Sequence, residues 1–371
     1  MTDRAVLRGT PRPAWGERVS SLGYRLARPV LFRTGDAEAI HERTVRAVGT
    51  LGSSAVLRAV ARAVTGPRGD EVEFAGLRFP GPVGLAAGMD KYGMAVRGWA
   101  SLGFSHVELG TVTAKAQPGN DKPRLFRLPT SRAVINRMGF NNPGAAALAE
   151  RLASYGITRG GRQAGLVVGV SIGKSKVTPL TEAVEDYVTS LRAVAPHADY
   201  IAINVSSPNT PGLRSLQDKG FLADLTSTLV TEARSLDRVA PVPVLVKLAP
   251  DLSTEAVAEA VEVCTDAGIS GLIATNTTIE RSGLSAADRS MASQTGGLSG
   301  APLRRRSREF VAALTRMTDL PVIGVGGIMS AQDADAMVEA GARLVQVYSG
   351  LVYAGPALVS GVNRRHGGNR R

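Results

Sequence analysis

Short apolar runs and longer stretches of helical periodicity alternate from about residue 80 to the C-terminal end. Stretches such as Thr181–Val194, Ser253–Ala267 and Ala331–Ala340 have apolar residues every three to four positions, which predicts helices. The runs typical of buried strands are 83–87, 106–109, 166–172, 200–203, 242–248, 271–274, 322–325 and 344–347. Eight strands alternating with helices predict an α/β fold, a (β/α)8 TIM barrel. A doubly wound sheet is the alternative, which is disfavoured because no GxGxxG follows the first strand.

The first 65 residues carry a different pattern, in which apolar stripes of helical spacing are flanked by arginine. The stripes are Trp15, Val19, Leu22 and Leu26, then Ile40, Thr44, Ala47, Val48 and Leu51, then Val56, Leu57, Val60 and Val64. Pro29 is expected to interrupt the first helix. Because Thr65–Asp70 is polar and turn-rich, we expect a small N-terminal helical extension (1–68) and a barrel domain (69–371). The extension either lies in a membrane interface or caps the barrel.

The net charge of +12 is concentrated at the two ends of the chain. Residues 1–70 carry twelve Arg, no Lys and six acidic residues, a net +6, and residues 364–371 carry four Arg, a net +4, which leaves +2 for residues 71–363. Basic ends on a nearly neutral body suit an anionic membrane surface, and we expect no nucleic-acid partner. An arginine excess that reflects codon bias and solubility is the alternative.

Few residues are of the types that bind metals or form disulfides. The single cysteine, Cys264, excludes a disulfide framework, and none of the four histidines has metal-ligand spacing, so we expect no metal site. His106, in a strand, and Cys264, in a helix, are expected in the core, and His197 at the surface or a helix end. No apolar run reaches eighteen residues, so the sequence predicts no membrane-spanning helix.

Polar side chains gather directly after the predicted strands. In the densest cluster, IAINVSSPNTPGL (201–213), more hydrogen-bonding side chains follow the strand than a turn requires, which indicates a ligand. Similar segments are AAGMDK (86–91), ELGTVT (108–113), INRMGFNN (135–142), SIGKSK (171–176), ATNTT (274–278), GVGGI (324–328) and YSG (348–350). Because the carboxyl ends of barrel strands meet on one face, the sequence predicts a site there.

Two further features suggest what this site binds. Lys247 lies inside the apolar run VLVKLAP, where a lysine requires either a ligand or an ion pair, with Asp251 as the candidate partner. The glycine-rich segments TGGLSG (295–300) and GVGGI (324–328) allow backbone amides to approach a phosphate, although each glycine could equally serve a tight turn. Together they indicate a phosphorylated cofactor.

Taken together, these motifs resemble the dihydroorotate dehydrogenases, in particular the quinone-dependent class 2 branch. The motifs AAGMDK, GNDKPRLFRLP, INRMGFNN, INVSSPNTPGLR, TNTT, TGGLSG, IGVGGI and VQVYSG occur in that family's order and spacing. Ser207, where the soluble class 1 enzymes have Cys, and the N-terminal extension both favour class 2. A soluble class 1-like enzyme that uses fumarate or NAD is the alternative.

The resemblance implies oxidation of dihydroorotate to orotate in pyrimidine biosynthesis, with hydride transfer to N5 of FMN. Ser207 would be the base that removes the C5 proton, in a relay and shielding arrangement shaped by Thr210 and Phe140. FMN contacts are expected from Ala87, Gly88, Lys91, Thr111, Ser171, Asn204, Lys247, Thr275, Gly300, Gly327, Tyr348 and Ser349. Substrate contacts are expected from Lys91, Asn136, Arg137, Met138, Gly139, Phe140, Asn204, Asn209, Asn276 and Thr277. Ser171 departs from the Asn usual in the family, so either a water bridges it to the flavin or it contributes less.

The resemblance also implies a second partner, a membrane quinone (ubiquinone or menaquinone). The N-terminal helices would form an apolar tunnel to the flavin, in which His41, Arg127 and Tyr348 match tunnel residues. Without the resemblance, His41 would be taken for an exposed helix residue. We expect a peripheral monomer on the cytoplasmic face of a bacterial cell membrane.

Overall fold

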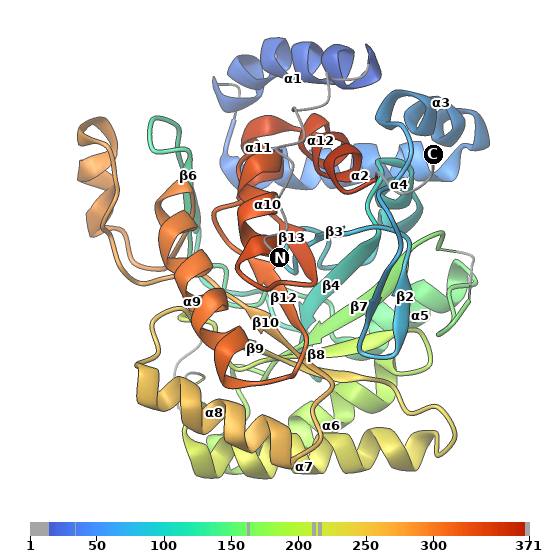
Figure 1. Cartoon of the computed structure of the whole chain (residues 1–371), viewed down its shortest axis with the longest axis vertical. Coiled ribbons are helices and arrows are strands. Elements are labelled where there is room, and N and C mark those ends of the chain that lie inside the picture. The colour runs from blue at the N-terminus through green and yellow to red at the C-terminus, as the bar shows by residue number, and fades with distance from the viewer. Residues whose placement is uncertain (1–14, 34, 162–163, 210–212, 214–216, 368–371) are drawn as a thin grey trace, which may run out of the picture.

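A closed barrel of eight parallel strands forms the body of the protein (Figure 1). The computed structural model describes residues 15–33, 35–161, 164–209, 213 and 217–367. The barrel strands are β3 (Val83–Leu85), β4 (His106–Val112), β7 (Val167–Ile172), β8 (Tyr200–Asn204), β9 (Val244–Leu248), β10 (Gly271–Ala274), β12 (Val322–Val325) and β13 (Leu344–Val347). They close in the order β10–β12–β13–β3–β4–β7–β8–β9. The predicted barrel is confirmed, and each strand overlaps one of the eight apolar runs.

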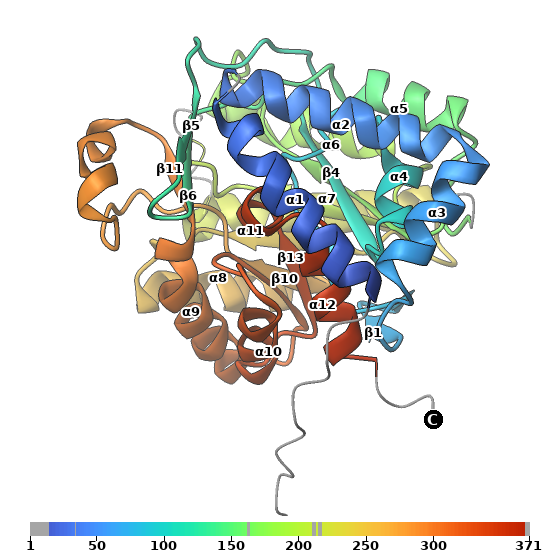
Figure 2. The same cartoon turned by 90° about the horizontal axis from the view of Figure 1, so that it is seen from above.

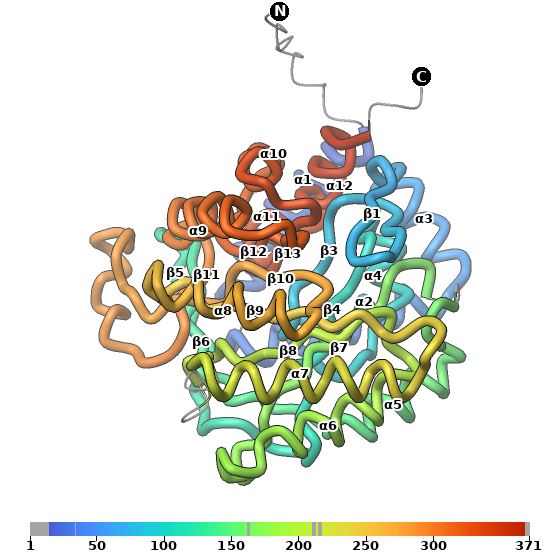
Figure 3. Tube along the Cα trace, turned by 60° about the horizontal axis from the view of Figure 1, so that its bottom comes forward, coloured from blue at the N-terminus to red at the C-terminus, as the bar shows by residue number. Residues whose placement is uncertain are grey.

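Helices on the outside of the barrel cover the outward-facing strand residues (Figure 3). They are α4 (Val96–Ser101), α5 (Ala145–Ser154), α6 (Ala183–Val194), α7 (Lys219–Leu236), α8 (Thr254–Asp266), α9 (Arg304–Met317), α10 (Ala331–Glu339), α11 (Ser349–Ala354) and α12 (Ala357–Arg365). In α8, for example, the Ser253 side chain caps the first turn by accepting from the Ala256 amide, and Val257, Val261 and Cys264 face the core. The expected core positions of His106 and Cys264 are confirmed, and His197 is half-buried just after α6.

The hairpin of β1 (Val72–Phe74) and β2 (Leu77–Phe79) contributes to the apolar cluster inside the barrel. Phe74 and Phe79 pack there with Tyr200, Leu245 and other inward-facing strand residues. Glycine makes room for the larger rings: a Cβ at Gly169 would lie 2.0 Å from the Tyr200 ring. This packing fills the end of the barrel opposite to the predicted site.

A three-stranded antiparallel sheet lies beside the barrel mouth. Its strands are β5 (Leu125–Leu128), β6 (Ala133–Asn136) and β11 (Gly297–Gly300), in the order β11–β6–β5. The predicted INRMGFNN segment begins in β6, and the TGGLSG segment ends in β11. The short helices η1 (Leu180–Glu182), η3 (Ala286–Ser293) and η4 (Ala301–Leu303) complete the connections.

The N-terminal helices α1 (Trp15–Arg33), α2 (Ala37–Ser53) and α3 (Ala55–Thr65) lie together on one side of the barrel (Figure 2). Hydrogen bonds from Tyr24 Oη to Val352 O (2.6 Å) and from Arg28 to Tyr353 O (2.8 Å) fasten α1 to α11. The apolar stripe of α1 does not face the barrel, since Trp15 and Leu26 are 75% and 70% exposed. In the part of the chain that the structure describes, no helix has the length and apolarity to cross a bilayer.

The expectation that Pro29 interrupts the first helix was wrong, because α1 continues through it to Arg33. Proline removes one amide donor, which leaves the carbonyl of Arg25 without its helical partner. Both residues are exposed, so water can satisfy that carbonyl and the helix continues.

Candidate active site

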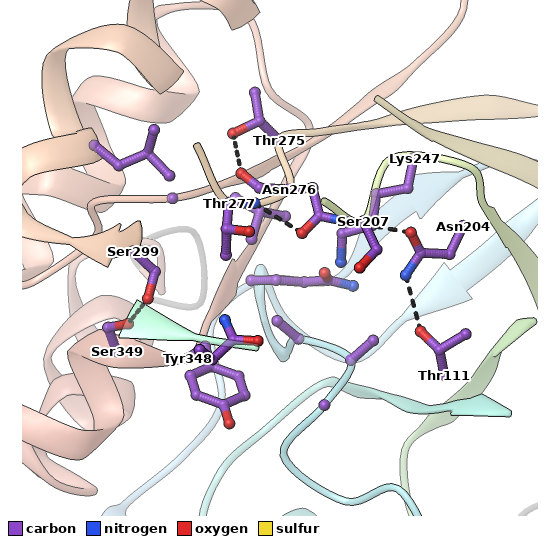
Figure 4. Close-up of a pocket in the computed structure, with 18 of the residues that line it drawn as sticks. Thr111, Asn204, Ser207, Lys247, Thr275, Asn276, Thr277, Ser299, Tyr348 and Ser349 are labelled. Carbon is purple, nitrogen blue, oxygen red and sulfur yellow. Dashed lines mark hydrogen bonds between the residues drawn. The ribbon is translucent and has the colours of Figure 1, made fainter. Parts of the chain in front are cut away.

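A cavity of about 1030 Å³, counting its open mouth, occupies the carboxyl end of the barrel. Every barrel strand except β7 contributes lining residues from itself or from the loop after it. The polar lining residues are Lys91, Thr111, Asn136, Asn204, Ser207, Asn209, Lys247, Thr275, Asn276, Thr277, Ser299, Gln346, Tyr348 and Ser349. Figure 4 shows Thr111, Asn204 and Lys247 towards one end of this cavity and Ser299 and Ser349 towards the other. An elongated ligand with a polar group at each end would suit this distribution.

Asn204, the last residue of β8, organises one end of the cavity. Its amide nitrogen donates to Thr111 Oγ1 (2.9 Å), and its oxygen accepts from Asn276 Nδ2 (3.2 Å). Asn276 also donates to Ser206 Oγ (2.9 Å). These bonds join the ends of β4, β8 and β10, so each amide is held in one orientation before a ligand binds.

Ser207 follows this network and lines the cavity while being only 5% exposed. Its Oγ accepts from the backbone amide of Asn209 (3.2 Å), and Asn209 Nδ2 donates to Asn136 Oδ1 (3.1 Å). The hydroxyl is thus fixed in a site with little solvent. Thr210, the predicted relay residue, lies outside the described residues.

Lys91 contributes a buried ammonium group without a protein partner. Its side chain is in the cavity wall and the residue is 8% exposed, yet none of the described residues bonds to its ammonium. Burial lowers the pKa of Lys91 to about 8. The nearby carboxylate, Glu38, is already bound by Arg124 through a 2.7 Å ion pair. An anion in the cavity would supply the negatively charged partner that the Lys91 ammonium lacks.

Lys247, from β9, forms the floor of the cavity. Its Nζ donates to Glu108 Oε1 (3.3 Å), and the lysine and the glutamate are 5% and 0% exposed. Asp251, the candidate partner under the ion-pair alternative, does not pair with Lys247: it accepts from Thr278 and pairs with Arg306 outside the cavity. The reason is geometric, because Lys247 points into the barrel, where β4 presents Glu108.

Glycines and serines form the other end of the cavity. Gly300 (φ +96°) and Gly327 (φ +71°) have left-handed backbone that glycine favours. A Cβ at Gly327 would lie 2.2 Å from Arg304 Cα, and one at Gly300 would lie 2.4 Å from Arg132 O. Ser299 Oγ and Ser349 Oγ are hydrogen-bonded at 2.8 Å. Close backbone packing with small polar side chains suits a phosphate group.

Comparisons with known proteins agree with this geometry. Residues 70–365 match the family model for dihydroorotate dehydrogenase. A curated protein of Salinispora arenicola named dihydroorotate dehydrogenase (quinone) is 56% identical over 339 residues, covering 90% of this chain and 96% of its own. One of the same name from Chloroflexus aurantiacus is 52% identical over 357 residues, covering 94% and 97%. The chain belongs to the dihydroorotate dehydrogenase family, in its quinone-dependent class 2 branch.

A solved structure of this family has the same architecture. The crystal structure of the Eimeria tenella dihydroorotate dehydrogenase in complex with ferulenol superposes with a TM-score of 0.76 at 35% identity. It covers 91% of this chain and 93% of its own. The alignment includes most of the chain, so the whole fold is that of the family.

Most residues expected to contact FMN or dihydroorotate do line the cavity. Besides the polar residues given above, of which Ser299 and Gln346 were not expected, they are Ala87, Gly88, Met138, Gly139, Phe140, Gly300 and Gly327. Two do not. Ser171 is fully buried behind Thr111, whose Oγ1 is 2.9 Å from Ser171 Oγ. Arg137 turns away, since its guanidinium bonds Gln294 Oε1 (2.8 Å) and Pro123 O (2.9 Å).

The three expected tunnel residues, His41, Arg127 and Tyr348, line a second cavity of about 1060 Å³, again counting its open mouth. Its other walls are mostly apolar and include Tyr24, Leu31, Phe32, Ile40, Val48, Leu351 and Val352. Tyr348 belongs to both cavities, and its ring stacks on that of His41 with centroids 6.5 Å apart. Burial and the charge of Lys91 lower the pKa of His41 to about 3, so its ring is neutral at pH 7.

Sequence reasoning missed Ser299 and Gln346, which line the first cavity, and Glu108, Glu38 and Arg124, which are buried outside both cavities. Glu108 and Gln346 lie within barrel strands, and both are fully buried. Glu38 and Arg124 form a buried ion pair that joins α2 to the segment before β5. For Glu108 and Gln346 the available signal was a charged or amide side chain inside an apolar strand, the criterion already applied to Lys247.

The residues present fit an FMN molecule. Gln346 lines the cavity, and its Oε1 is buried with no donor among the described residues, so it requires a hydrogen-bond donor from a ligand. Lys91 and Lys247 offer cations, while the Gly300 and Gly327 end suits a phosphate. Lys247, Gln346 and the glycine end would hold FMN through its ring edge and its phosphate.

Proposed function

We propose that this chain oxidises dihydroorotate to orotate through FMN and passes the electrons to a membrane quinone, either ubiquinone or menaquinone. The observation that carries the proposal is the arrangement of two cavities, one polar and one apolar, that share the Tyr348 ring. A polar substrate and an apolar electron acceptor would then reach opposite sides of one cofactor. The names of the relatives, dihydroorotate dehydrogenase (quinone), support the same pair of substrates.

The amide-rich end of the first cavity would bind dihydroorotate. The substrate carries a carboxylate and a pyrimidine ring with alternating donors and acceptors. Lys91 supplies an unpaired cation for the carboxylate, and the side-chain amides supply both donors and acceptors for the ring. They belong to Asn136, Asn204, Asn209 and Asn276. Because these amides already bond one another, they would hold the ring in one orientation.

Ser207 would remove the proton from C5 of the substrate. Its oxygen is fixed by the Asn209 amide, and its surroundings exclude most water, which a weak base requires. Phe140 lines the same wall and would shield the site, and Thr210 would continue the proton path. FMN, when bound, supplies the acceptor at N5 for the hydride from C6. Thr111 and Thr275 would contribute to cofactor binding, with Ser171 acting through Thr111.

Residues 1–68 would form the quinone-binding and membrane-binding unit, and residues 69–371 the catalytic domain. Helix α3, like α1, exposes its apolar residues, since Val56 and Val60 are 72% and 56% exposed. Exposed apolar stripes beside numerous arginines suit binding to an anionic bilayer surface. We therefore propose a peripheral monomer on the cytoplasmic face of a bacterial membrane.

The test is an acceptor comparison with the purified full-length protein. Dihydroorotate is supplied with a short-chain ubiquinone, with fumarate or with NAD, and orotate formation is followed. Rapid orotate formation with the quinone, and none with fumarate or NAD, supports the proposal. Turnover with fumarate or NAD but not with the quinone would favour the soluble class 1-like alternative instead.

A further inference from the structure

Glu108 is a buried carboxylate for which the proposed chemistry has no role. It lies in the middle of β4, is 0% exposed and is not a lining residue of the cavity. Its Oε1 accepts from Lys247 Nζ (3.3 Å), and its Oε2 accepts from Gln346 Nε2 (2.9 Å) and Tyr200 Oη (3.3 Å). Gln346 Nε2 also lies 3.3 Å from Tyr200 Oη. The group thus connects β4, β8, β9 and β13 inside the barrel.

Burial of a carboxylate in this position is unfavourable unless it is paired. An apolar residue of similar size would pack there without that penalty, and the cluster of Phe79, Leu245 and Leu344 deeper in the barrel shows that such packing is available. The structural effect of this charge is therefore on the side chains that it binds. Both neighbours that line the cavity, Lys247 and Gln346, are held through this one carboxylate.

Lys247 depends on Glu108 for its place in the cavity floor. Glu108 is the one acceptor that the described residues offer its ammonium, and an ammonium has three donors. The remaining donors are available to a ligand above the floor. Gln346 is oriented in the same way: because its nitrogen donates to Glu108, its oxygen is the atom left for the ligand.

We propose that Glu108 is a positioning residue that fixes the Lys247 ammonium and the Gln346 amide under the cofactor, and that its negative charge limits how strongly Lys247 favours the reduced cofactor. This inference rests on the proposed function. A unit positive charge under the ring stabilises extra electron density, and a carboxylate 3.3 Å behind it subtracts from that field. The pair therefore sets the reduction potential, whereas Lys247 alone would make the bound cofactor easier to reduce.

The test compares the reduction potential of bound FMN in the full-length protein and in Glu108→Gln. This change keeps the shape of the side chain and removes the charge; one carboxylate oxygen becomes an amide donor, and the amide oxygen can still accept from Lys247. We expect the affinity for reduced over oxidised FMN to increase about tenfold, which for a two-electron couple moves the midpoint about 30 mV more positive. Tyr200→Phe is the matched control, because it removes a neutral donor from the same carboxylate, and its midpoint is expected to stay within about 10 mV of the wild type.

Three results overturn the inference: a midpoint in Glu108→Gln equal to that of the wild type, a shift to more negative potential, or an equal shift in Tyr200→Phe. Should Glu108→Gln lose FMN, the variant Glu108→Asp, which keeps the negative charge, decides. Recovery of FMN binding in Glu108→Asp supports a pairing role, because the charge of Lys247 is again compensated, and no recovery overturns it. Failure of the proposed function can be told apart from failure of this inference, because the wild-type protein itself would then lack FMN or would not be reduced by dihydroorotate.

Discussion

The unpaired Lys91 ammonium makes binding of an anionic substrate dependent on pH. Burial moves the pKa of this lysine from 10.5 to about 8, which corresponds to a penalty of about 3 kcal/mol on the charged form. Since the charged form is the one that attracts a carboxylate, substrate binding weakens as pH rises through 8. At pH 9 about a tenth of the molecules keep the charge in the free enzyme.

The test compares two variants of Lys91 with the wild type between pH 7 and pH 9. Lys91→Arg keeps its charge throughout this range, whereas Lys91→Met lacks it throughout. The assay is kcat/KM for dihydroorotate, which reports groups of the free enzyme. We expect the ratio of wild type to Lys91→Arg to fall about tenfold from pH 7 to pH 9, because pH effects common to both proteins cancel. Lys91→Met is expected to be weak at every pH.

A ratio that stays constant across this range would refute the reasoning, as would a Lys91→Met variant with normal kcat/KM. Neither His41 nor Tyr348 can produce the predicted fall. Burial lowers the pKa of His41 to about 3 and raises that of Tyr348 to about 12, so both lie outside the interval. The direction of the pH effect is also fixed. A buried lysine with a lowered pKa loses its charge, and with it the affinity for a carboxylate, as pH rises.

Three further predictions concern separate parts of the molecule. Ser207→Ala should lose most turnover and keep its FMN absorbance; full activity would exclude Ser207 as the base. Glu38→Gln should lower the free energy of unfolding by about 3–5 kcal/mol in urea titrations, because it leaves the buried Arg124 without its carboxylate partner. Glu42→Gln, which breaks an exposed ion pair, should change this free energy by less than about 1 kcal/mol. Leu26→Glu should reduce the amount of protein that floats with anionic vesicles, whereas Val239→Glu, at a position 95% exposed on the barrel, should not. Equal effects would argue against membrane binding through the apolar stripe of α1.

The barrel could be predicted because each of its strands appears in the sequence as a short apolar run. Runs such as 271–274 and 344–347 match their strands to the residue. Polar clusters after the strands likewise placed Asn204, Ser207 and Asn276 on one face, since parallel strands bring their carboxyl ends together.

Long-range pairings could not be predicted in the same way. The partner of Lys247 was sought four residues away and lies 139 residues away, because the closing of the barrel decides which strands face one another. The two sides of the second cavity, α2 and the segment after β13, are joined only in the folded chain. Arg137 illustrates the same limit: it is in the right motif, but its side-chain direction depends on Gln294 and Phe126.

The central claim is that one bound flavin connects the polar and the apolar cavity. It is tested most directly by following the visible flavin absorbance of the purified full-length protein under anaerobic conditions. Dihydroorotate alone should bleach the absorbance, and a quinone added afterwards should restore it. A colourless protein, a flavin that dihydroorotate leaves unchanged, or a bleached flavin that no quinone reoxidises would contradict the account.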